Sequence, residues 1–135
     1  MGKILGIDFG MKRSGIAISN EDKDIAFGRQ VLETAILEDY LADLFTQEKI
    51  DTVVLGLPVN LSGQDSDQTT QVRFFADFVK RTWPSVEVVL WDERYSTKAA
   101  SDLIGNMPDR DRKSSKKLID MLSAVYILQG YLDRH

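Results

Sequence analysis

Three short strand-like segments precede the first helical pattern of this sequence, and this order restricts the fold more than any other feature. The three segments cover residues 3–9 (KILGIDF), 14–20 (SGIAISN) and 25–33 (IAFGRQVLE). Alternating segments joined by short turns predict an antiparallel meander. Helical spacing then covers 35–50 and 67–83, alternating with apolar strand-like runs at 52–57 and 86–92. We therefore predict an α/β fold with a mixed five-stranded sheet and helices on both faces.

The remaining segments are predicted to be a loop over 58–66, a short helix over 97–106 and a long final helix. The final helix is expected to begin at Ser114 or Ser115, either of which can cap it, and to run to about Leu132. Its apolar stripe on a helical projection consists of Leu118, Met121, Leu122, Val125, Leu128 and Leu132. Asp120 falls outside the centre of that stripe. The chain shows no internal repeat or linker, so we expect a single domain over 1–135.

The composition excludes several kinds of active site. The chain has no cysteine, and its single histidine is the last residue, His135. This makes a thiolate site, a histidine triad and a multi-histidine metal site incompatible with the sequence. Carboxylates, hydroxyls, lysine and arginine are left, and a metal bound by oxygen ligands alone would be Mg²⁺ or Mn²⁺. The sequence has no apolar run long enough to span a membrane, and its first residues lead us to expect no signal peptide. We therefore expect a cytoplasmic protein without membrane contact.

Charge is distributed unevenly along the chain. The formal net charge is −4, whereas residues 108–117 (PDRDRKSSKK) hold five basic and two acidic residues. A local basic patch on an acidic protein can contact phosphate groups. The same segment also fits a solvated loop that leads into a helix. Charge alone leaves both interpretations open.

Three carboxylates stand at positions where burial or strand geometry makes them unusual. Asp8 lies in the first strand, where alternation places it on the face of Gly6, opposite Ile7 and Phe9. Burying an unpaired charge costs several kcal/mol or so. Glu93 directly follows the last predicted strand, and Asp120 lies in the largely apolar final helix. Taken singly, Asp8 could cap a turn, Glu93 could be an ordinary surface residue, and Asp120 could interact with the helix dipole.

Taken together, the three acids predict a site for one or two hard cations. Crowded carboxylates repel one another unless cations lie between them. Two such ions can stabilise both the attacking and the leaving oxygen of a phosphodiester. Two other classes of function stay open at this point. One is an ATP-binding fold of the actin and sugar-kinase type, whose phosphate loop also follows a strand, and the other is a non-catalytic nucleic-acid-binding module.

Four motifs in this order resemble the YqgF family, also known as the RuvX family of pre-16S rRNA nucleases and Holliday junction resolvases. They are GIDFGMKRSGIAIS, VVLGLPVNLSG, DERYST and IDMLSAVYILQGYL, and they span essentially the whole chain. The resemblance implies a ribonuclease H-like fold and a metal-dependent nuclease. It implies that Asp8, Glu93 and Asp120 are the catalytic acids and bind Mg²⁺ or Mn²⁺.

The resemblance also implies which residues contact the substrate. Phosphate or polar contacts are expected from Lys12, Arg13, Asn60 and Arg94. The basic segment supplies three further expected phosphate contacts, Arg112, Lys113 and Lys116. The chain departs from the family pattern at Asn20, where many members have aspartate, and at Tyr95, where an aliphatic residue is usual. Both departures affect only details of substrate contact.

The expected partner is nucleic acid, either a ribosomal RNA precursor, within ribosomal particles, or branched DNA. Resolving a four-way junction requires two coordinated cuts and normally a symmetric dimer. The sequence shows no clear dimer seam, so we expect a monomer or a weak homodimer. This expectation favours trimming of the 5′ end of pre-16S rRNA over junction resolution.

Overall fold

The computed structural model describes residues 2–57, 67–92 and 116–134. The elements are β1 (Lys3–Asp8), β2 (Arg13–Ser19), β3 (Ala26–Glu33), η1 (Thr34–Ile36), α1 (Leu37–Gln47), β4 (Ile50–Leu57), α2 (Asp67–Thr82), β5 (Glu87–Asp92) and α5 (Lys116–Arg134). This order confirms the predicted one for the described part of the chain. The loop predicted over 58–66 and the helix predicted over 97–106 lie outside it.

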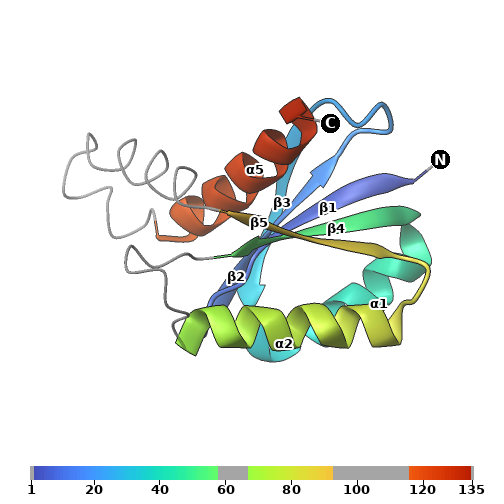
Figure 1. The fold of residues 1–135 in the computed structure, drawn as a ribbon. Helices are drawn as coiled ribbons and strands as arrows, with labels where there is room; N and C mark the ends of the chain where they lie inside the picture. Colours follow the sequence, from blue (N-terminus) through green and yellow to red (C-terminus); the bar gives the residue numbers. More distant parts are fainter. Residues whose placement is uncertain (1, 58–66, 93–115, 135) are drawn as a thin grey trace, which may run out of the picture.

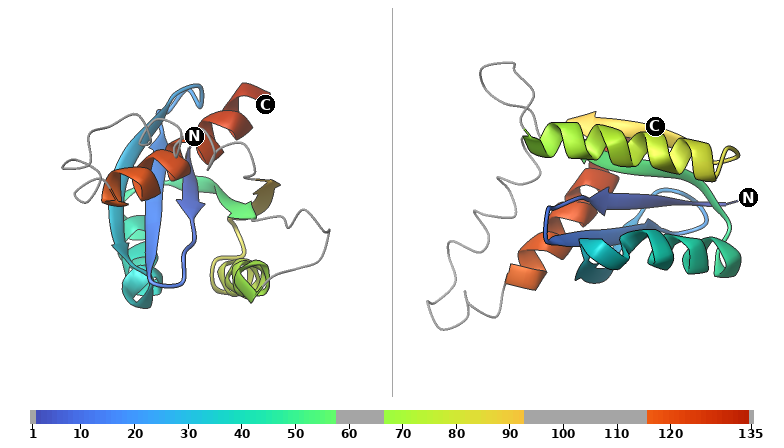
Figure 2. Two further views of the ribbon diagram at one scale, coloured as in Figure 1. Left: turned by 90° about the vertical axis from the view of Figure 1, so that its left-hand side faces the viewer. Right: turned by 90° about the horizontal axis from the view of Figure 1, so that it is seen from below.

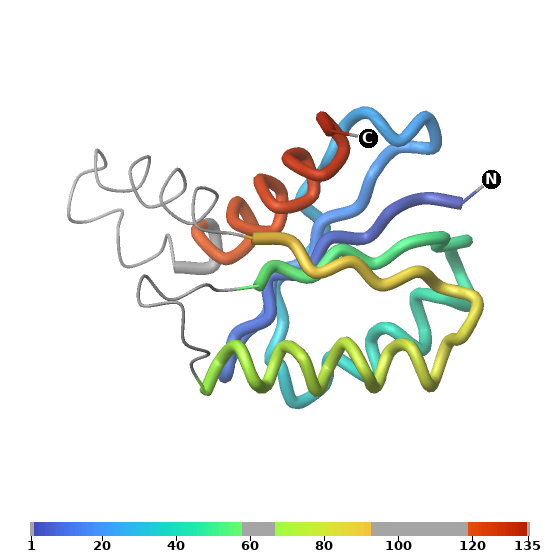
Figure 3. Tube along the Cα trace, viewed as in Figure 1, coloured from blue at the N-terminus to red at the C-terminus, as the bar shows by residue number. Residues whose placement is uncertain are grey.

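The five strands form one mixed sheet in the order β3-β2-β1-β4-β5. The first three strands pair antiparallel, as their short connections predict. Strand β4 pairs parallel with both β1 and β5, because a helix connects each successive strand. The carboxyl ends of β1, β4 and β5 therefore lie at one end of the sheet, where α2 and α5 also begin (Figure 3). In α/β sheets this end commonly carries the functional site.

The helices form two layers, with α5 on one face of the sheet and α1 and α2 on the other (Figures 1 and 2). Each face has its own core. Leu5 and Ile7 of β1 belong to the larger core, under α1 and α2. Ile4 belongs to the smaller core, under α5, together with Ile127 and Leu128. Alternation along β1 thus separates the two faces as the sequence predicts. None of the described helices is long and apolar enough to cross a membrane.

Helix α5 lies unusually close to the sheet because three strand glycines face it. A Cβ added at Gly6 would lie 2.7 Å from Cβ of Leu128, and one at Gly28 would lie 2.8 Å from Met121. At Gly15 the added Cβ would lie 2.1 Å from the backbone oxygen of Asp120. The absence of side chains at these positions allows the first turns of α5 to pack directly on the backbone of β2.

Two sequence predictions need correction. The helix predicted over 35–50 ends at Gln47, because Glu48 adopts an extended conformation and Ile50 is buried as the first residue of β4. The predicted stripe of the final helix is rotated from the observed one. Residues 121, 122 and 125 are half-buried, whereas Ala124 and Ile127 are completely buried. Asp120, one turn before Ala124, therefore lies on the side of α5 that meets the sheet.

Candidate functional site

Asp8 and Asp120 come together around Gly15 at the carboxyl end of β1. Asp8 pairs with Gly15 across the antiparallel ladder, and such pairs have Cα atoms about 5 Å apart. Asp120 contributes the backbone oxygen that lies against Gly15. Asp8 also shares the α5 face with Gly6, which packs against Leu128. Two acids that are far apart in sequence thus lie on the same face of one strand pair.

Arg13 joins this group through an ion pair with Asp120. The Arg13 Nε atom lies 3.4 Å from Oδ2 of Asp120, and the two side chains are 42% and 28% exposed. Burial raises the pKa of the Asp120 carboxyl, and the Arg13 guanidinium offsets only part of that shift. Asp120 is therefore a carboxylate whose charge is incompletely compensated by the described residues.

The loop between β1 and β2 is held by a closed ring of three hydrogen bonds. Thr34 Oγ1 donates to the carbonyl oxygen of Gly10 at 2.6 Å and lies 2.7 Å from Oγ of Ser14. Because the Thr34 hydroxyl proton is used on Gly10, the Ser14 hydroxyl donates to Thr34 Oγ1. Ser14 Oγ in turn accepts the N–H of Gly10 at 3.4 Å. Ser14 is completely buried, so the ring fixes the loop from inside.

Two further contacts attach the same loop to its neighbours. The N–H of Thr34 donates to the carbonyl oxygen of Lys12 at 2.9 Å. The side chain of Gln68, in the first turn of α2, donates to the carbonyl oxygen of Phe9 at 3.2 Å. The backbone that carries Lys12 and Arg13 is thus bonded to the junction of β3 with η1 and to the start of α2.

Lys12 and Arg13 line an open hollow of about 700 Å³ on the surface. Its other walls are Met11, Glu33 and Ala35, and both Lys12 and Arg13 are exposed. Two cations that line a hollow, one of them paired with Asp120, can bind a phosphate group through charge-assisted hydrogen bonds.

Of the residues predicted for the site, four lie in the described part with their side chains, namely Asp8, Lys12, Arg13 and Asp120. The other predicted site residues lie outside the described residues or, for Lys116 at the start of α5, have a side chain outside them: Asn60, Glu93, Arg94, Arg112, Lys113 and Lys116. Within the described residues there is no group of three or more histidine, cysteine, aspartate or glutamate side chains that could hold a metal ion. Glu93 directly follows Asp92, the last residue of β5, and lies outside the described residues, so its role in the site stays a prediction.

Sequence reasoning missed Ser14 and Thr34, since a single hydroxyl gives no sign of a partner 20 positions away. It also connected Asn20 with substrate contact. The structure places Asn20 at the opposite end of β2, where its Oδ1 accepts the N–H groups of Asp24 and Ile25. Asn20 closes the turn between β2 and β3, remote from Asp8.

Comparison with known proteins gives a consistent family. The sequence profile of the family described as "RuvX: Holliday junction resolvase" matches residues 2–134. The protein called "Putative pre-16S rRNA nuclease" of Bacillus licheniformis is 40% identical over 139 residues, covering 97% of this chain and 96% of that protein. Its namesake in Porphyromonas gingivalis is 38% identical over 138 residues, covering 98% and 97%.

Solved structures with a similar architecture include two resolvases. The Fowlpox virus resolvase in complex with Holliday junction DNA superposes with a TM-score of 0.61 at 16% identity, covering 98% of this chain and 97% of the resolvase. The T. thermophilus RuvC in complex with Holliday junction substrate gives 0.59 at 14% identity, covering 99% and 96%. At these identities the likeness concerns the fold, and it confirms the predicted ribonuclease H-like α/β architecture.

Proposed function

The chain belongs to the RuvX family of Holliday junction resolvases, and on this premise we propose that it is a nuclease that hydrolyses phosphodiester bonds in RNA. The observation that carries the proposal is the meeting of Asp8, Asp120 and Arg13 around Gly15. Two acids and a cation at the carboxyl end of a central strand are the groups that phosphodiester hydrolysis needs.

We propose that Asp8, Asp120 and Glu93 hold Mg²⁺ or Mn²⁺. Their oxygen-only chemistry fits such ions, and the raised pKa of Asp120 marks a site where a bound cation would offset the cost of burial. Glu93 directly follows β5 in sequence, and the carboxyl end of β5 lies at the same end of the sheet as that of β1. For this reason we propose Glu93 as the third ligand. When bound, the ion would supply an activated water and positive charge for the leaving oxygen.

The protein's own residues would bind and orient the substrate. Arg13 pairs with Asp120, and Lys12 precedes Arg13 in the chain and lines the same hollow; both would contact phosphates near the cleaved bond. Arg13 has a second role, since its ion pair holds the Asp120 carboxylate in place. Further contacts are proposed from Asn60, which follows β4 in sequence, and from four residues that follow β5: Arg94, Arg112, Lys113 and Lys116.

We propose pre-16S rRNA, processed at its 5′ end in the cytoplasm and within ribosomal particles, as the natural substrate. The names of the two relatives at 38% and 40% identity support RNA. The description of the family supports a second candidate, cleavage of four-way DNA junctions. Junction cleavage would require a stable homodimer, whereas RNA processing is compatible with a monomer or a weak homodimer.

The decisive experiment compares Asp8→Asn and Asp120→Asn with the wild-type protein on a model pre-16S RNA and on a four-way DNA junction, with Mn²⁺ and product mapping. Each variant is expected to lose RNA cleavage by orders of magnitude while remaining folded. Asp22→Asn, which removes an exposed acid from the turn between β2 and β3, serves as the matched control and should cleave normally. Normal cleavage by Asp8→Asn would disprove the site, and cleavage of the junction alone would disprove the substrate.

A further inference from the structure

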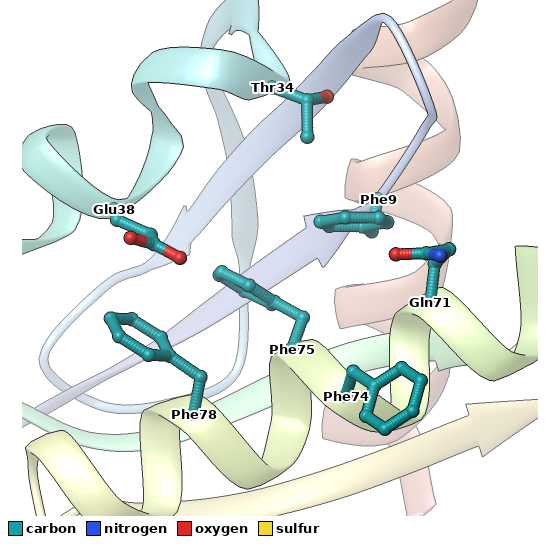
Figure 4. A pocket seen from close by; sticks show the side chains of 7 residues that line it. All are labelled: Phe9, Thr34, Glu38, Gln71, Phe74, Phe75 and Phe78. Atoms are coloured by element: carbon teal, nitrogen blue, oxygen red, sulfur yellow. The ribbon is translucent and has the colours of Figure 1, made fainter.

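A pocket of about 210 Å³ lies on the opposite face of the sheet from Asp8, between α1, α2 and the end of β1. Seven residues line it: Phe9, Thr34, Glu38, Gln71, Phe74, Phe75 and Phe78 (Figure 4). An apolar cavity of about 150 Å³ is large enough to hold benzene, so this one can take a larger planar ring. The pocket adjoins the proposed active site, because Phe9 directly follows Asp8 and Thr34 holds the loop of Lys12.

Aromatic rings form the floor and rim of this pocket. The ring centroids of Phe9 and Phe75 are 5.1 Å apart with planes tilted by 31°, and Phe75 stacks on Phe78 at 6.1 Å. Phe74 lies at the rim and is 63% exposed, although a phenylalanine has no polar atom that would favour contact with water. Such an open aromatic surface is typical of sites that stack a flat ligand.

Two polar side chains enter the same pocket from opposite sides. Figure 4 shows the carboxylate of Glu38 and the carboxamide of Gln71 directed toward the space beside Phe75. Neither makes a hydrogen bond to any other residue in the described segments. One carboxylate and one amide that face each other across a set of rings can bind a flat molecule that has two adjacent donors on one edge and acceptors on the other.

We propose that this pocket binds an unpaired guanine base of the nucleic-acid substrate. Guanine offers the N1–H and N2–H donors to Glu38 and its O6 and N7 acceptors to the amide of Gln71. Adenine and cytosine would instead present a ring acceptor to the carboxylate, which repels it. The inference rests on the proposed function, because a nucleic acid must reach this pocket. It adds a base preference that the carboxylates of the proposed active site do not provide.

The location favours a base over an apolar segment of a protein partner. Thr34, which lines the pocket, is hydrogen-bonded to Gly10 and Lys12 in the loop that carries the two cations proposed to bind phosphate, so one strand can contact both. An apolar protein segment would leave the carboxylate of Glu38 buried without a donor, at an energetic cost. Stacking and two polar contacts are expected to give about tenfold tighter binding of guanine than of uracil.

The test measures binding separately from cleavage. Fluorescence anisotropy in EDTA would give the affinity for an unstructured oligouridine RNA and for the same RNA with one central guanosine, adenosine or cytidine. Wild type is expected to prefer the guanosine RNA about tenfold. Glu38→Gln and Phe74→Ala should lose this preference while still binding oligouridine. Phe27→Ala, which removes an exposed phenylalanine from β3, and Glu21→Gln are matched controls that should keep it.

The other outcomes distinguish failure of the pocket assignment from failure of the proposed nuclease. Equal affinity for the four RNAs, or a guanine preference that survives Glu38→Gln and Phe74→Ala, would overturn the pocket assignment and leave the proposed nuclease intact. A shift of the sedimentation coefficient in Phe74→Ala, without loss of guanine preference, would identify the pocket as a contact between copies of the chain. Guanine preference combined with absent cleavage would support the pocket and refute the nuclease.

Discussion

Gly15→Ala is the substitution that tests most directly how the helix α5 is held against the sheet. The added methyl group would lie 2.1 Å from the carbonyl oxygen and 2.7 Å from the carbonyl carbon of Asp120. Ordinary van der Waals contact begins at 3.4 Å, so α5 must withdraw from β2 by about 1.3 Å, the difference between the two distances. The obstacle is backbone, which cannot rotate away as a side chain can.

The expected consequences are a moderate loss of stability and a large loss of activity. Overpacking of this kind costs about 1–3 kcal/mol, which for a chain of this length lowers the melting temperature by roughly 3–12 °C. Displacement of Asp120 by about 1 Å is expected to lower the rate of cleavage by about a hundredfold. Thermal unfolding followed by circular dichroism, and single-turnover cleavage of a model RNA, measure the two effects.

Gly28→Ala is the matched control for this prediction. It adds the same methyl group on the same face of the sheet, but the nearest atoms, at 2.8 Å, belong to the flexible side chain of Met121. We expect a smaller loss of stability and near-normal cleavage. If Gly15→Ala matched wild type in melting temperature and rate, or if Gly28→Ala were equally damaging, the close packing of α5 on Gly15 would not be what places Asp120.

Three further outcomes are expected. Thr34→Val opens the hydrogen-bond ring and leaves the buried Ser14 hydroxyl without its acceptor, so urea unfolding should show a loss of about 1–3 kcal/mol and cleavage a raised KM, both recovered in Thr34→Ser. Asp120→Asn should abolish cleavage yet raise the stability of the protein in EDTA at neutral pH. The folded-state pKa of Asp120 lies above its ordinary value of 3.8. The stabilising contribution of this carboxyl is therefore present below pH 3.8 and is lost as the pH rises through the raised pKa. A less stable Asn variant at neutral pH would contradict this sign. Lys12→Ala should reduce the slope of the logarithm of RNA affinity against the logarithm of salt concentration by about 0.7, as expected for one lost phosphate contact, and an unchanged slope would remove Lys12 from the proposed interface.

The acids illustrate what local periodicity could predict about the site. Alternation along β1 placed Asp8 on the face of Gly6, and the structure confirms that this face meets α5. For the nearly all-apolar final helix, the sequence pattern did not determine which side faces the sheet. Its most apolar stripe centres on residues 121, 122 and 125, whereas the buried side includes Ala124 and Ile127. The rotation of a helix that is apolar on most sides is decided by the shape of the surface it meets, here by the bare backbone at Gly15.

The order of apolar runs along the chain was sufficient to predict the described strands and helices and the mixed sheet, because each pattern of burial belongs to a single element and can be recognised within it. The rotation of α5, the ring that joins Ser14 to Thr34, and the meeting of Phe9 with the rings of α2 were decided only by the tertiary structure. Each of these features depends on the distance between backbones that are remote in sequence, and such distances are set by how whole elements pack.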